Sequence, residues 1–346
     1  MQAGSRNVAR PRLGHGRTSG KLSTTMRRLP VALAIVASSL LSPLLSPSVL
    51  FGADDVERTL AVDGVTRRYL LHVSPGLHGR NSPSPLVLVF HGGGGRASGM
   101  EKLTRFDEAA DRHGFLLVYP EGVGRHWNDG RGLSDVDDVG FVAALVKDLS
   151  ARLPVDPHRV FAAGISNGGF FSQALACRLA DTFAAVASVA ATMGEPLLPA
   201  CKPARPVSVM FVMGDEDPLV PIGGGPVART RGRAVSLDAA VRFWAAKDEI
   251  SAPRMSEEIP DRDPKDGTRT RHESCQWGLE GAAVEAWIVE GGGHTWPGGL
   301  QYLPKFLIGA TSRDFDATDE ILKFFEGHGR KAGAGAPAPR NATRSF

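Results

Sequence analysis

Cysteine is scarce in this sequence, with three in 346 residues, so at most one intramolecular disulfide can form. Metal-binding patterns are also missing, because His, Asp and Glu nowhere form a cluster with ligand spacing. The glycine-rich stretch 92–95 lacks the Lys-Ser/Thr ending of a phosphate-binding loop. The chain contains no internal repeat. We therefore expect neither a metal nor a cofactor.

Acidic residues are absent from the first 53 positions, which hold seven of the 40 Lys and Arg. The formal net charge of +3 is misleading for this reason. Residues 54–346 carry 33 basic against 37 acidic side chains, a net charge of −4. A mildly acidic body argues against a nucleic-acid partner.

An apolar run of comfortable membrane-spanning length is lacking as well. The run from Leu29 to Leu41 follows Arg27-Arg28 and has the length of a signal peptide. Residues 1–53 are therefore predicted to be a targeting segment, with cleavage near Ala53 and Met26 as an alternative start. The protein is expected to be secreted, and it would meet a membrane only if this segment is retained.

With 42% hydrophobic and 22% charged residues, the chain suits a globular protein with one substantial core. An Asp63-Gly64 turn predicts an N-terminal antiparallel hairpin. Apolar strands then alternate with helices, which predicts a mostly parallel sheet with helices on both faces. Strands are predicted at 59–62, 67–73, 85–90, 115–119, 159–161, 183–190, 207–213 and 283–290, and helices at 104–112, 138–153, 170–180, 237–246 and 316–325.

The catalytic domain is expected to span residues 54–328 and the tail 329–346 to be disordered. Asp316 is the expected N-cap of the last helix. Residues 251–272 are charged and contain three prolines, so they are predicted to form a surface excursion or an irregular hairpin. A monomer is expected.

The pattern Gly164-Ile165-Ser166-Asn167-Gly168 stands between a predicted strand and a predicted helix. This context is typical of a nucleophile elbow, in which a strained turn presents the serine. The Asn167 backbone N–H would then point to a developing oxyanion at a helix N-terminus. The alternative is an ordinary glycine-rich turn, so partners elsewhere in the chain must decide.

Those partners follow two other predicted strands. His294 lies in Gly291-Gly292-Gly293-His294, directly after the strand at 283–290, and is the candidate base. Three carboxylates, Asp215, Glu216 and Asp217, compete to orient it. Asp215 lies closer to its strand and could cap the turn, whereas Asp217 lies further out toward the histidine loop. The order Ser, Asp, His is that of α/β-hydrolases.

A second oxyanion donor is expected from His91-Gly92-Gly93-Gly94-Gly95, where glycine lets the backbone approach a substrate. We assign this role to the N–H near Gly93.

Seven motifs of the chain belong together, namely His91–Gly94, Tyr119–Gly122, Trp127-Asn128, Asp137–Phe141, Gly164–Gly169, Asp217–Pro221 and Gly293–Gly298. Through them the chain resembles, from about Arg58 to Gly327, the secreted polyhydroxybutyrate depolymerase and feruloyl-esterase-like family of α/β-hydrolases. The resemblance implies Ser166 as nucleophile, Asp217 rather than Asp215 as acid, and His294 as base. Members cleave esters of short hydroxyalkanoates, plant-wall phenolic acids or acetylated sugars.

Two features depart from this family, and one is the absence of a cysteine pair that members sometimes carry soon after the Trp-Asn motif. Ile250 stands where members often carry a cysteine that pairs with a later one, so Cys275 would lack that partner. Cys177 and Cys201 are the better pair by position, although Cys177 could equally be a small buried apolar residue. Trp127 and Trp296 either line a substrate pocket or pack the loops.

The sequence thus predicts a serine esterase that works by two-step acyl transfer on a small or polymeric ester. The alternatives are a peptidase on the same scaffold and a binding protein without turnover. The glycine-rich loops, together with a charged stretch from Glu257 to Arg271 that cannot form an apolar lid, predict a preference for short or compact aromatic acyl groups.

Overall fold

The computed structural model describes residues 56–79 and 82–330. By its contacts the chain divides into Met1–Val49 and Leu50–Phe346, and the described residues all belong to the second unit. The predicted targeting segment 1–53 and most of the tail 329–346 lie outside the described residues. None of the described helices combines the length and apolar character that a bilayer crossing requires.

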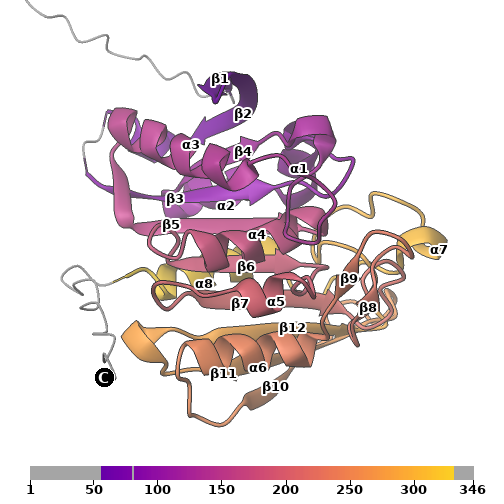
Figure 1. Ribbon diagram of the computed structural model, residues 1–346. Coiled ribbons are helices and arrows are strands. Elements are labelled where there is room, and N and C mark those ends of the chain that lie inside the picture. Colours follow the sequence, from indigo (N-terminus) through magenta and orange to yellow (C-terminus); the bar gives the residue numbers. More distant parts are fainter. Residues whose placement is uncertain (1–55, 80–81, 331–346) are drawn as a thin grey trace, which may run out of the picture. The chain divides into compact units, whose positions relative to one another are not determined.

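A single large sheet organises the described residues, with ten strands in the order β1-β2-β4-β3-β5-β6-β7-β12-β11-β10 (Figure 1). The six strands from β4 to β12 in that order run parallel, and β1, β2, β11 and β10 add antiparallel pairs at the two sides. The strands are β1 (Val56–Val62), β2 (Val65–Val73), β3 (Ser84–Phe90), β4 (Leu116–Pro120), β5 (Val155–Ile165), β6 (Ala185–Val189), β7 (Ser208–Gly214), β10 (Met255–Ile259), β11 (Arg269–Cys275) and β12 (Val284–Glu290).

Helices cover both faces of this sheet, and each face has its own apolar core. The helices α3 (Asp138–Arg152), α4 (Asn167–Arg178) and α6 (Leu237–Lys247) lie in front of the sheet in Figure 1. The helices α1 (Ala97–Thr104), α2 (Phe106–His113) and α8 (Ala317–Gly327) contribute to the second core. The fold is therefore the expected α/β-hydrolase fold with an N-terminal antiparallel hairpin.

Short elements occupy the connections. They are the helices α5 (Leu197–Ala200) and α7 (Lys305–Ile308), the 3₁₀ turns η1 (Pro75–Leu77), η2 (Val123–Arg125) and η3 (Leu279–Gly281), and the strand pair β8 (Gly225–Pro226) and β9 (Arg233–Ala234). Figure 1 shows α7 and the β8–β9 pair at the same edge of the sheet.

One helix was missed, and one surface segment is more regular than expected. The helix expected at 104–112 is α2, whereas α1 was not predicted, and Arg105 separates the two in a left-handed conformation (φ 54°). Of the two alternatives for residues 251–272, a surface excursion or an irregular hairpin, the structure has a hairpin, in which β10 pairs antiparallel with β11. Cross-strand ion pairs join this hairpin to the sheet, since Arg271 pairs with Glu290, and His272 lies between Glu257 and Glu285.

Candidate active site

Ser166 lies at the sharp turn between β5 and α4, with φ 56° and ψ −120°. This conformation is unfavourable for a residue with a side chain, so the surrounding structure must hold it. The flanking glycines make the turn possible. A Cβ on Gly164 would lie 2.5 Å from the Gly168 carbonyl oxygen, and one on Gly168 would collide with the Phe90 carbonyl. The turn has the geometry of a nucleophile elbow.

His294 and Asp217 meet beside this turn. Their loops follow the adjacent parallel strands β12 and β7, and His294 Nδ1 lies 2.7 Å from Asp217 Oδ2. Both side chains are buried. The other carboxylate oxygen of Asp217 accepts the backbone N–H groups of Leu219 (2.7 Å) and Val220 (2.9 Å). These bonds fix the carboxylate, which in turn orients the imidazole with Nε2 directed away from it.

Asp215 has a different role. Its side chain is exposed, and Oδ1 accepts the backbone N–H of Gly291 at 2.7 Å. That bond ties the end of β7 to the start of the histidine loop. The structure thus distinguishes the competing carboxylates, since Asp217 contacts the imidazole and Asp215 caps a turn.

The glycine-rich loop after β3 runs against the elbow. A Cβ on Gly92 would lie 3.5 Å from Ser166 Cβ, and one on Gly93 would lie 3.7 Å from Asn167 Cβ. Within the described residues, the backbone N–H groups of Gly93 and Asn167 have no hydrogen-bond partner. Two unpaired donors beside the serine are the arrangement that an oxyanion requires.

His91 holds this loop in place through two hydrogen bonds of its imidazole. Its Nδ1 bonds the Gly92 carbonyl at 2.8 Å, and its Nε2 accepts the Gly122 N–H at 3.0 Å. Burial lowers the pKa of His91, which keeps the ring neutral and suited to both bonds. His91 is therefore a structural support of the loop.

The Asn167 side chain fixes a neighbouring loop. Its amide oxygen accepts the Trp127 N–H at 2.8 Å, and its nitrogen donates to the Trp127 carbonyl (3.0 Å) and to Asp129 Oδ2 (2.7 Å). Asp129 is buried and also pairs with Arg131 at 2.6 Å. The amide is fully occupied in this way, which leaves the Asn167 backbone N–H as its contribution toward a ligand.

The two tryptophans, which were candidates for lining a substrate pocket, are both buried. Trp296 is fully buried, packs against Phe106 and donates to Thr318 Oγ1 at 3.0 Å. Packing, the second alternative, therefore describes Trp296, and its assignment to substrate binding was wrong. Trp127 is 1% exposed and stacks on Phe171, and it also contributes to the lining of a cavity, so both alternatives apply to it.

Two cavities meet at Ser166. The first, here called the apolar cavity, has a volume of about 380 Å³ and contains Ser166, His294, Met100, Leu103, Leu303 and Ile308 in its lining. The second, here called the basic cavity, has a volume of about 540 Å³ and is lined in part by Gly93, His126, Arg131, Ser166, Asn167 and Arg231. Volumes of this size suit small-molecule ligands.

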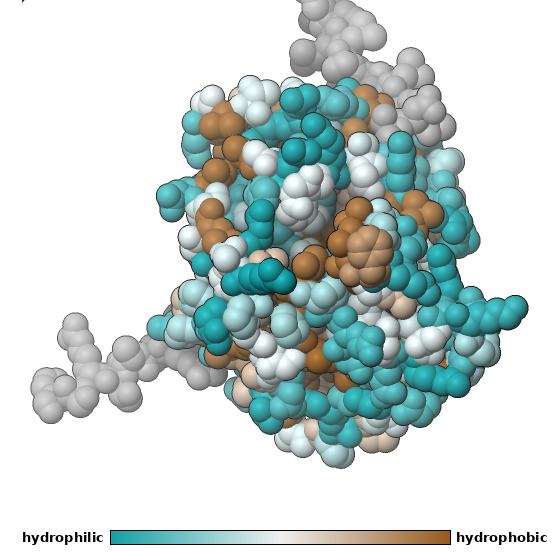
Figure 2. Space-filling model, turned by 90° about the vertical axis from the view of Figure 1, so that its right-hand side faces the viewer, coloured by the Kyte–Doolittle hydropathy of each residue, from teal (hydrophilic) through white to brown (hydrophobic). Residues whose placement is uncertain are grey.

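An exposed apolar segment borders the apolar cavity. It comprises residues 300–307, in which Phe306 is 85% exposed. Figure 2 looks onto this edge and shows hydrophobic side chains gathered beside a hollow. Tyr302 anchors the segment by donating its hydroxyl to the His294 carbonyl at 2.7 Å, and burial, followed by the nearby Asp217 charge, raises its pKa.

The sequence prediction named Ser166, Asn167, His294, the glycine-rich loop and Trp127, and it missed the other residues that line the two cavities. The apolar segment 300–307 could have been recognised from the sequence, because it follows the His294 loop directly and its apolar residues do not alternate as in a strand. His126 and Arg231 carry no such signal, because they come from separate loops that only the fold brings together.

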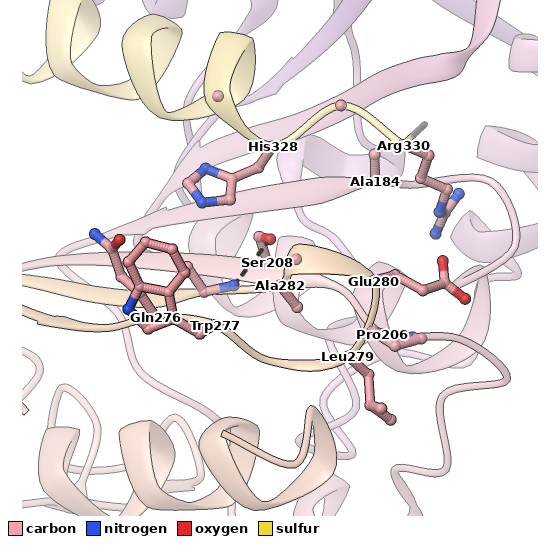
Figure 3. Close-up of a pocket in the computed structure, with 14 residues that line it drawn as sticks. Ala184, Pro206, Ser208, Gln276, Trp277, Leu279, Glu280, Ala282, His328 and Arg330 are labelled. Atoms are coloured by element: carbon pink, nitrogen blue, oxygen red, sulfur yellow. Dashed lines mark hydrogen bonds between the residues drawn. The ribbon is translucent and has the colours of Figure 1, made fainter. Parts of the chain in front are cut away.

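A further hollow of about 290 Å³ lies at the opposite edge, near the starts of β7 and β12 (Figure 3). Trp277 and His328 border it, and Ser208 Oγ accepts the Ala283 N–H there at 3.2 Å. Its lining does not include Ser166, Asp217 or His294. In residues 56–79 and 82–330, no three His, Cys, Asp or Glu side chains are grouped to hold a metal ion.

The comparisons with known proteins agree with this geometry. Residues 67–217 match the family model described as Esterase PHB depolymerase. NocK of Nocardia uniformis subsp. tsuyamanensis, named as a candidate esterase, is 36% identical over 294 residues, which cover 80% of this chain and 83% of NocK. Feruloyl esterase B of Piromyces equi is 28% identical over 237 residues, which cover 66% of this chain and 42% of that relative.

A solved structure shows the same fold at lower identity. The acetyl xylan esterase from Aspergillus awamori aligns with a TM-score of 0.51 and 14% identity, covering 75% of this chain and 94% of that one. This similarity concerns the fold, whereas the relation to NocK concerns most of both sequences. The chain belongs to the polyhydroxybutyrate depolymerase and feruloyl-esterase-like family of α/β-hydrolase esterases.

Proposed function

We propose that this protein is a secreted serine esterase that hydrolyses carboxylic esters through an acyl-enzyme on Ser166. One observation carries the proposal. The buried 2.7 Å contact between His294 and Asp217 lies beside an elbow serine that shares a cavity with the histidine. A base oriented by a carboxylate is what a serine hydroxyl needs to become a nucleophile.

In the first step, Asp217 accepts a hydrogen bond from the Nδ1–H group of His294, which leaves Nε2 unprotonated and able to take the Ser166 proton. Ser166 Oγ then bonds to the ester carbonyl carbon, and the carbonyl oxygen becomes an oxyanion held by the N–H groups of Asn167 and Gly93. His294 gives the proton to the departing alkoxide as the C–O bond breaks. The acyl group stays on Ser166.

In the second step, His294 takes a proton from water, and the resulting hydroxide attacks the acyl carbon. The same two N–H groups hold the second oxyanion. His294 returns its proton to Ser166 Oγ as the acid leaves. Ser166 Oγ makes no hydrogen bond to another described residue before substrate binds, and such contacts often tighten only in the complex.

For the substrate, we propose short hydroxyalkanoate oligomers or phenolic and acetyl esters of plant-wall sugars. The family model's description and the names of the relatives support this range. The apolar cavity beside Ser166 supports a compact acyl group.

A panel of p-nitrophenyl esters, with matched p-nitroanilides, tests the function. We expect ester turnover in the wild type and a loss of roughly 10³-fold or more in Ser166→Ala, with an unchanged circular dichroism spectrum. Anilide cleavage of similar efficiency would indicate a peptidase instead. Binding of esters without Ser166-dependent turnover would indicate a binding protein.

Export is proposed from the composition of residues 1–53, which lie outside the described residues. N-terminal sequencing of protein exported by the host should find a chain that starts near Asp54. A mature chain that starts before Arg27 would contradict this.

A further inference from the structure

Arg231 is a cation without an acidic partner at the active site. It lines the basic cavity, and this cavity has neither Asp nor Glu in its lining. Within the described residues, its guanidinium contacts His126 and makes no ion pair. Arg131, the other arginine of the cavity, pairs with buried Asp129. One exposed guanidinium without a carboxylate partner therefore lines the same cavity as Ser166.

The contact with His126 positions this charge without cancelling it. His126 Nε2 lies 3.0 Å from Arg231 Nη1, and His126 Nδ1 lies 3.0 Å from the Gly124 carbonyl oxygen. A guanidinium can only donate, so Nε2 must accept, and Nδ1 must carry the ring proton that bonds Gly124. The imidazole is therefore neutral, and Arg231 keeps its full charge.

The backbone around Arg231 is fixed as well. Arg231 lies in the short loop between β8 and β9, where its N–H donates to the Val227 carbonyl at 2.9 Å. Its own carbonyl accepts Arg131 Nη1 at 2.8 Å. A charge held at a defined place is suited to recognise one group on a ligand.

We propose that Arg231 determines specificity by binding a free carboxylate on the part of the ester that enters the basic cavity. The inference rests on the proposed function and names a substrate class within it. A guanidinium matches the fork of a carboxylate geometrically. When two hydroxy acids are joined by an ester, the alcohol half carries a free carboxylate. The class is therefore an oligoester of hydroxy acids with its acid end free.

The test compares a 3-hydroxy-acid dimer with a free carboxylate and the methyl ester of the same dimer. Wild type, Arg231→Gln and Arg229→Gln are assayed on both. Arg229 is the matched control, because it is exposed on the same loop and does not line the cavity. We expect Arg231→Gln to lower kcat/KM for the free acid by about 10- to 100-fold, mainly through KM, as for a hydrogen bond to a charged group. Methyl-ester turnover should change by less than about threefold.

Several outcomes would overturn the proposal. In the first, Arg231→Gln lowers kcat/KM equally for both dimers, or for neither. In the second, Arg229→Gln shows the same selective loss on the free acid. In the third, the wild type fails to cleave the free-acid dimer. Methyl-ester turnover also reports whether the variant folds. The proposed function fails separately, namely if Ser166-dependent hydrolysis is absent for the methyl ester and for p-nitrophenyl acetate alike.

Discussion

At the scale of single residues, two aspartates of one loop differ in what their carboxylates contact. Asp217 is buried against His294, whereas Asp215 is exposed and accepts the Gly291 N–H. The sequence places both after the same strand, and it does not tell which carboxylate turns inward. The resemblance to the family indicated Asp217, and the contact with the histidine is consistent with that assignment.

Replacing the two aspartates tests the assignment. Asp217→Asn removes the charge that stabilises the protonated histidine, so we expect kcat to fall by roughly 10³-fold or more. Asp215→Asn keeps an oxygen for Gly291, and we expect kcat within about threefold and unfolding free energy within about 0.5 kcal/mol of wild type. Steady-state kinetics and urea unfolding measure both. A larger kcat loss in Asp215→Asn than in Asp217→Asn would reverse the roles.

Asp248 is a buried carboxylate outside the active site. It lies at the end of α6 with no exposed surface, and Oδ1 accepts the Val207 N–H at 3.3 Å while Oδ2 has no partner among the described residues. Burial raises its pKa to about 7. The folded state thus keeps Asp248 protonated at a pH where the unfolded chain has released this proton. The contribution of Asp248 to the free energy of unfolding is therefore fully present below about pH 4, and it is lost as the pH rises to about 7.

The Asp248→Asn variant should remove this dependence. Between pH 5 and pH 8 we expect the wild type to lose on the order of 3 kcal/mol of unfolding free energy relative to the variant. Urea unfolding of both proteins across this range gives the difference. Parallel pH profiles would show that Asp248 is not the group responsible.

At the scale of elements, most strands and helices could be predicted from apolar runs and turn residues. Asp316, for example, caps α8 as expected by accepting the Thr318 N–H at 2.8 Å. The exceptions depend on long-range contacts. His272 of β11 pairs with Glu257 and Glu285 on the two neighbouring strands, and the residues of the basic cavity come from the separate loops after β3, β4, β5 and β7. Local patterns do not contain this information.

One element pair is joined covalently. A disulfide links Cys177 at the end of α4 to Cys201 after α5, 24 residues later, and Cys275 is a buried free thiol. The structure thus gives the pairing favoured by position and leaves Cys275 without the bridge common in the family. A bridge of this kind belongs to an oxidising compartment, consistent with export.

Removing the bridge should destabilise the fold. Closing a loop of this length contributes about 3 kcal/mol, so the double variant Cys177→Ala/Cys201→Ala should lose about that much unfolding free energy. Cys275→Ala is the control, with an expected loss of about 1 kcal/mol. Dithiothreitol should lower the wild type to the level of the double variant and leave the latter unchanged. A wild type indifferent to reductant would argue against the bridge.

At the scale of the whole molecule, we expect the apolar cavity to limit which acyl groups are turned over. A cavity of about 380 Å³ can enclose a compact acyl group. Each methylene that extends beyond the cavity stays in water and lacks the burial free energy of about 0.8 kcal/mol. We expect C2 to C4 p-nitrophenyl esters and methyl ferulate to exceed a C16 ester in kcat/KM by about 10-fold or more. A preference for C16 would mean that the apolar segment 300–307 closes over long chains.

The meeting of two cavities at Ser166 has a consequence for the proposed acyl-enzyme mechanism. In that mechanism, departure of the alcohol half would empty its cavity while the acyl group still occupies Ser166, so a small hydroxyl compound could enter in place of water. The acyl-enzyme would then partition between hydrolysis and transacylation. In a concentrated pool of hydroxy acids, the same chain would lengthen oligomers as well as shorten them, and water activity would set the balance.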